Sequence, residues 1–167
     1  MGLGMSRTGW RLSRNVHAMN GTVYRAPRVF LAVFYALLAA WTIGFVPLAL
    51  SKALVVNVTF LVMVVFFTAY SWYWSLGISY VIEARADGSM QFVSARRRIL
   101  TRAGEVARVQ GPSLPIGVGF LRFGLEGETV YVFYVENTGI RTILSEMLAA
   151  NPEIRFKGLP QRAFRRP

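Results

Sequence analysis

The chain has 167 residues, is 54% hydrophobic and carries a formal net charge of +11, with a mean hydropathy of +0.41. It contains no cysteine, which excludes disulfides, thiolate metal sites and thiol nucleophiles. Two long apolar runs fill much of the first half, so the remaining residues are enough for only one small folded domain.

Residues 1–28 form a basic arm ahead of the first apolar run. The arm has no aspartate or glutamate, and its basic residues are Arg7, Arg11, Arg14, Arg25 and Arg28. Apolar residues interspersed with the first three arginines predict a short helix at the membrane interface, followed by a turn; a floppy basic tail is the alternative. Either way, Arg7, Arg11 and Arg14 are candidate contacts to a partner or to lipid.

The two apolar runs cover residues 29–50 and 54–76. Each can cross a bilayer, because about 20 helical residues span a hydrocarbon core of about 30 Å. Only residues 51–53 separate them, so we expect an antiparallel transmembrane hairpin over 29–76. Neither run contains Asp, Glu, Lys, Arg or His. Since ionisable groups at membrane depth mark ion and proton paths, we do not expect this chain to transport anything by itself.

The distribution of basic residues predicts the orientation. Lys and Arg close to membrane spans are retained in the cytoplasm, and the hairpin tip carries Lys52 alone against five arginines in the arm. We therefore expect a multi-pass protein of the cell inner membrane with both termini in the cytoplasm. Its charge suits the anionic phospholipids of the cytoplasmic leaflet. A nucleic-acid partner would also attract so basic a chain, but is not expected beside membrane spans.

The end of the second run is rich in aromatic side chains, namely Tyr70, Trp72, Tyr73 and Trp74. Amphipathic rings settle at headgroup level, so these four predict a membrane-interface belt. A contact to a pigment or cofactor is the alternative, and no cofactor is expected.

Residues 77–158 are expected to form one α+β domain, followed by a basic tail at 159–167. Alternating apolar positions and turn residues predict strands at 78–84, 90–94, 97–101, 105–110, 117–125 and 129–135. The period then changes to that of an amphipathic helix, whose apolar face comprises Ile140, Ile143, Leu144, Met147 and Leu148. Asn137 or Thr138 caps its start, and Asn151 with Pro152 ends it. A short extended piece is expected at 154–157.

This order of elements resembles that of small bacterial membrane proteins in which a two-helix hairpin precedes a pleckstrin-homology-like (PH-like) domain. The resemblance rests on the turn at 87–89 leading into the strand at 90–94, on the strand at 105–109, and on 144–154. It implies an antiparallel barrel or sheet closed by one C-terminal amphipathic helix, acting in recognition or as a scaffold without catalysis. The first turn departs from lipid-binding PH domains, because it contains Asp87 and no Lys or Arg, which argues against phosphoinositide binding there.

The densest charge cluster is Arg96, Arg97 and Arg98, followed by Arg102. One interpretation is a contact to lipid phosphates or to an acidic patch of a partner, which the arginine fork can bind bidentately. The other is a strand edge kept charged to prevent edge-to-edge pairing.

No catalytic or metal-binding group is expected from the sequence. His17 is the only histidine and has no carboxylate at metal-ligand spacing, and the serines lack a nearby base. The sequence thus favours a non-catalytic accessory or scaffold subunit that packs against other integral membrane subunits. The alternative is a membrane-tethered sensor whose basic domain binds anionic lipid or a soluble regulatory partner.

Overall fold

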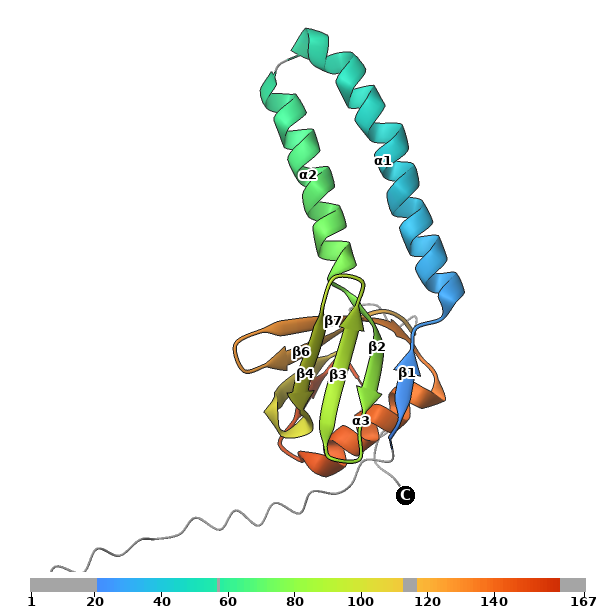
Figure 1. The fold of residues 1–167 in the computed structure, drawn as a ribbon, viewed down its shortest axis with the longest axis vertical. Coiled ribbons are helices and arrows are strands. Elements are labelled where there is room, and N and C mark those ends of the chain that lie inside the picture. Colours follow the sequence, from blue (N-terminus) through green and yellow to red (C-terminus); the bar gives the residue numbers. More distant parts are fainter. Residues whose placement is uncertain (1–20, 57, 113–116, 160–167) are drawn as a thin grey trace, which may run out of the picture.

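The structure is a computed structural model that describes residues 21–56, 58–112 and 117–159. The arginines at 7, 11 and 14, the helix expected in the arm and the basic tail from 160 onward lie outside the described residues. Within them, two apolar helices rise from one end of a sheet domain (Figure 1).

The first helix, α1, runs over Arg28–Val56 and the second, α2, over Val58–Leu76. Both are long and apolar enough to cross a membrane, with the candidate spans at Arg28–Leu48 and Val58–Leu76. The connection expected at 51–53 is wrong, because α1 continues through these residues. The helical propensity of Ala and Lys explains this, since both are good helix formers. The Ser51 hydroxyl stays within the helix and donates a hydrogen bond to the Leu48 carbonyl oxygen at 2.8 Å.

The domain contains one mixed, open sheet whose strand order is β4-β3-β2-β7-β6-β5-β8, with β1 paired to β2. The strands are β1 Val23–Arg25, β2 Ser79–Ala84, β3 Ser89–Ser94, β4 Arg98–Arg102, β5 Val106–Gln110, β6 Val118–Leu125, β7 Thr129–Val135 and β8 Arg155–Lys157. Each of the six predicted strands is confirmed to within one residue at either end. A 3₁₀ helix at Ala103–Glu105, which was not expected, joins β4 to β5.

The sheet is not purely antiparallel. Strands β2-β3-β4 and β5-β6-β7 form two antiparallel meanders, as the turn residues predicted. The pairs β2–β7 and β5–β8 are parallel, however. The β2–β7 pair is joined at a single register position, Ser79 opposite Val132, so the two meanders diverge soon after they meet.

Strand β1 was not predicted, and it changes how the helices connect to the domain. It pairs antiparallel with β2, with Val23 opposite Glu83 and Arg25 opposite Val81. The whole hairpin is therefore inserted between two neighbouring strands of one sheet: α1 follows β1, and α2 leads into β2 (Figure 1). Part of the segment expected to be a basic arm thus belongs to the folded domain.

Tyr24 in β1 connects the two meanders where their strands separate. Its side chain is 1% exposed, and its hydroxyl donates to the Phe133 carbonyl oxygen at 2.9 Å. The same hydroxyl accepts a hydrogen bond from the Val135 amide at 3.0 Å. One phenol therefore satisfies two backbone groups of β7 that have no neighbouring strand on that side.

The final helix, α3, spans Thr138–Ala150, as the apolar period predicted. Asn137 is its N-cap, because the side-chain oxygen accepts from the Ile140 amide at 3.0 Å. Four apolar side chains of α3 are fully buried and join the core formed by the sheet; they are Ile140, Ile143, Leu144 and Met147.

Candidate functional site

The base of the hairpin packs on the sheet through a cluster of aromatic rings, which we call the aromatic joint. Phe133 of β7 lies at its centre and is fully buried, with ring centroids 4.9 Å from Phe34 and 5.8 Å from Phe30, both in α1. Tyr35 and Phe120 complete it, at 6.3 Å and 5.4 Å from the same ring. Edge-to-face and tilted pairs at these distances attract beyond their buried area. The joint therefore fixes α1 against the sheet.

Trp74 packs the end of the second helix, α2, against the same part of the sheet. Its ring lies 6.1 Å from Phe120 and 5.3 Å from Tyr131, so it contacts both β6 and β7. The two helices are also tied to each other: Trp72 Nε1 donates to Thr42 Oγ1 at 2.9 Å, and the Tyr35 hydroxyl donates to the Ser75 carbonyl oxygen at 3.1 Å.

The four expected belt residues thus occupy different surroundings. Tyr70 and Tyr73 are 55% and 60% exposed. Trp72 spans the gap between the helices, and Trp74 packs on the sheet domain.

The arginines of the 96–98 cluster diverge. The loop from β3 to β4 meets the end of α2, where the Arg96 amide donates to the Leu76 carbonyl oxygen at 3.1 Å. The Arg96 guanidinium carbon lies 3.7 Å from the centroid of the Tyr73 ring, which is cation–π geometry. Gly77 keeps this approach open, since a Cβ there would lie 3.2 Å from Arg96 Nη2.

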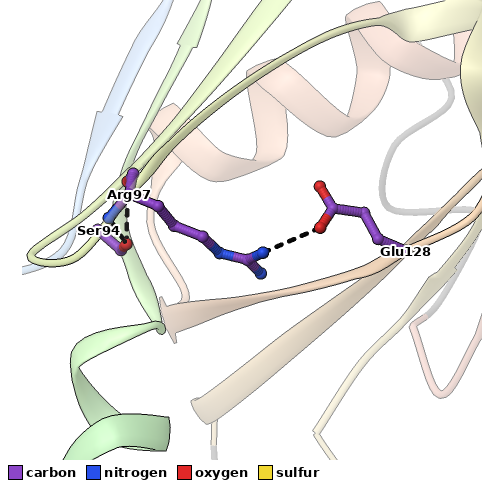
Figure 2. A network of polar contacts seen from close by, with 3 residues as sticks. All are labelled: Ser94, Arg97 and Glu128. Carbon is purple, nitrogen blue, oxygen red and sulfur yellow. Dashed lines mark hydrogen bonds and ion pairs between the residues drawn. The ribbon is translucent and has the colours of Figure 1, made fainter.

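Arg97 points to the other meander. Its Nη1 forms an ion pair with Glu128 Oε2 at 2.9 Å (Figure 2). The Arg97 amide donates a hydrogen bond to the Ser94 hydroxyl, which in turn donates to the Arg97 carbonyl oxygen. Both charged side chains are more than one third exposed, so we expect this pair to add at most about 1 kcal/mol of stability. Its charge is compensated within the domain.

Arg98 takes part in neither of the two ion pairs found among the described residues. It lies in a groove of about 590 Å³, which we call the basic groove, on the outer surface of strands β1 to β4. The groove carries four arginines and one carboxylate: Arg25, Arg28, Arg85, Arg98 and Glu83. It also reaches Leu31 in the first turn of α1. Sequence reasoning missed Arg85 as a site residue and placed Arg25 and Arg28 only as topological charges.

Arg102 lies at the other end of β4 and is exposed. Strand β4 is an outer strand of the sheet, and Leu100 in the same strand is 65% exposed. Arginines along such a strand discourage edge pairing with another chain. The position of Arg102 is compatible with this interpretation, whereas Arg98 also belongs to the basic groove.

The acidic residue in the first turn of the domain, between β2 and β3, has a structural role. Asp87 Oδ1 accepts hydrogen bonds from the Ser89 amide at 2.9 Å and from the Ser89 hydroxyl at 2.6 Å. These two bonds hold the pKa of the Asp87 carboxyl below its usual range. Among the described residues, no group of three His, Asp or Glu side chains lies close enough together to hold a metal ion.

No protein-family model, no curated protein and no solved structure matches the chain. The class of the protein is therefore given by its architecture. A helical hairpin is inserted between two neighbouring strands of an open, mixed sheet, and the aromatic joint packs the hairpin on that sheet.

Proposed function

We propose that the protein is a non-catalytic accessory or scaffold subunit of a larger integral membrane complex. The hairpin crosses the inner membrane and packs against helices of other subunits, and the sheet domain braces the cytoplasmic face. The observation that carries this proposal is the double attachment of the hairpin, through paired strands and through the aromatic joint.

This attachment favours a brace over a flexible tether. Only Ala26 and Pro27 separate β1 from α1, and only Gly77 and Ile78 separate α2 from β2. Three of these four residues also donate backbone hydrogen bonds that bind them to the sheet or to the end of α2. A sensor that searches the membrane surface needs a mobile linker, whereas these connections hold the domain in one orientation.

The surface of the hairpin supports the proposed contact with lipid and with other helices. Large apolar side chains point outward along both helices, including Leu37 and Ile43 in α1 and Val62 and Phe66 in α2, each at least 60% exposed. Trp41, at 54% exposed, lines a mainly apolar groove between the helices together with Phe60 and Met63. An orientation with both ends in the cytoplasm places the arginines at the hairpin base on the anionic leaflet.

The PH-like resemblance remains part of this proposal. Two three-stranded meanders and a C-terminal helix that joins the core support it. The inserted strand β1 and the parallel pairs β2–β7 and β5–β8 are the features that differ from the expected antiparallel arrangement.

Purification from native membranes in a mild detergent tests the proposed role. We expect the tagged full-length protein to be recovered in a complex of fixed stoichiometry with other integral membrane proteins, as measured by native mass spectrometry. Trp41→Ala should lower the recovery of that complex, because it removes a large, half-exposed side chain from the apolar groove that the two helices offer to a neighbouring helix. Leu100→Ser, an exposed change in the sheet domain, is the matched control and should leave recovery unchanged. A lone monomer or homodimer would contradict the proposal.

A further inference from the structure

We propose that the basic groove binds the phosphate group of an anionic phospholipid, with the acyl chains running up beside α1. This inference rests on the proposed insertion of the hairpin into a membrane. It assigns a headgroup site to the outer surface of the sheet, away from the β2–β3 turn that contains Asp87.

The register of four strands builds the membrane-proximal part of the groove as a single row. Arg25 is opposite Val81, Val81 is opposite Val93, and Val93 is opposite Arg98. Neighbouring strands lie about 4.8 Å apart, so the two arginine Cα atoms are separated by roughly 14 Å. Arginine side chains are long enough to approach one another from both ends of such a row. The row therefore offers two guanidinium groups above an apolar floor of two valines.

Further charge comes from the same face. Arg28 begins α1 and lines the same groove, and Arg85 lines the end of the groove away from the hairpin, where its Nη2 donates to Gln91 Oε1 at 2.7 Å. Glu83 is the one carboxylate of the groove, and it belongs to neither ion pair of the described residues. Four arginines against one glutamate leave an excess of positive charge, which planar, bidentate donors direct well toward phosphate oxygens.

The position and the lining of the groove favour a lipid over a soluble anion. The groove extends from the sheet to Leu31, within the segment of α1 that is apolar enough to cross a membrane. Its top therefore meets the depth at which phospholipid phosphates lie, once the hairpin is inserted. Leu31 in the apolar segment of α1 suits the acyl chains of an amphiphile, whereas a free phosphate ion would gain nothing from it. An acidic peptide of a partner would not need the contact with α1.

The test uses the full-length protein in nanodiscs and in a zwitterionic detergent, titrated with short-chain phosphatidylglycerol. Arg25→Gln combined with Arg98→Gln removes both ends of the row, and both side chains are exposed, so the fold should be kept. We expect the dissociation constant for phosphatidylglycerol to rise roughly 30-fold, with no change for phosphatidylcholine. The control combines Arg102→Gln with Arg155→Gln, which removes the same charge from exposed positions outside the groove and should change the constant less than about twofold.

An equal loss in the control variant would overturn the proposal, because it would show that only net charge matters. Tight binding of inorganic phosphate or of an acidic peptide, in preference to phosphatidylglycerol, would also overturn it. Extraction of the membranes with alkaline carbonate separates this failure from that of the proposed function. If the protein stays in the membrane without lipid preference, only the groove assignment is wrong; if it is released, the membrane insertion itself is wrong.

Discussion

Replacing Phe133 with alanine should lower the free energy of unfolding by about 3–5 kcal/mol, the usual cost of deleting a buried phenylalanine ring. The ring is fully buried and contacts four other rings of the aromatic joint. Its loss leaves a cavity between α1 and the sheet that the surrounding rigid rings cannot fill. Equilibrium unfolding in detergent micelles, followed by tryptophan fluorescence, measures the change.

The matched control for this variant is Phe66→Ala. Phe66 lies in α2 and is 61% exposed. Its replacement by alanine removes the same atoms as Phe133→Ala, but from the outer surface of the hairpin. We expect this control to change the free energy of unfolding by only about 0.5 kcal/mol. Similar losses for both variants would mean that the ring at the joint has no special importance.

Replacing Tyr24 with phenylalanine should lower the free energy of unfolding by about 1–3 kcal/mol, although it deletes only one oxygen atom. Without the hydroxyl, the Phe133 carbonyl and the Val135 amide lose their hydrogen-bond partner. Tyr131→Phe is the control, because the Tyr131 hydroxyl makes none of the hydrogen bonds recorded for the described residues, and it should be close to neutral. A neutral effect of Tyr24→Phe would show that Tyr24 does not hold the two meanders together.

The same variant should also alter the response to alkaline pH. Burial raises the pKa of the Tyr24 hydroxyl above its ordinary value of 10.0, so the folded state favours the neutral phenol. The corresponding stability is fully present below pH 10 and is lost as the pH rises through the folded-state pKa. Burial also raises the pKa of Tyr134, so Tyr24→Phe should reduce this loss without abolishing it.

Strands β2 to β7 and the helix α3 were predictable because their signals are local. The Asp87-Gly88 turn fixes the β2–β3 hairpin, and Gly88 adopts the positive φ of 79° that this turn requires. The helix α3 shows a clear period and a capping asparagine. Each of these features depends only on residues a few positions apart in the chain, so it can be predicted from one sequence.

The attachment of the hairpin could not be predicted for the opposite reason. Strand β1 has three residues, too few for an alternating pattern. Both helices separate it in the sequence from its partner β2. Phe30 and Phe34 fit equally well into an apolar span and into a contact with the sheet. The arginines at 96–98 form one cluster in the sequence, but strand pleating and the loop before β4 send their side chains to a tyrosine, a glutamate and the basic groove. Only the pairing of distant segments determines these contacts.

The central claim is that the sheet domain is held in one orientation on the hairpin, and a distance distribution tests it most directly. The chain has no cysteine, so spin labels can be attached at introduced Leu37→Cys and Leu100→Cys, which are 66% and 65% exposed. In nanodiscs, electron double resonance should give a single distribution as narrow as that of a reference pair within the sheet domain, Leu100→Cys with Arg155→Cys. Adding Phe133→Ala should broaden only the first pair. A broad or multiple distribution in the otherwise unaltered protein would contradict the account, because it would mean that the domain moves freely relative to the hairpin.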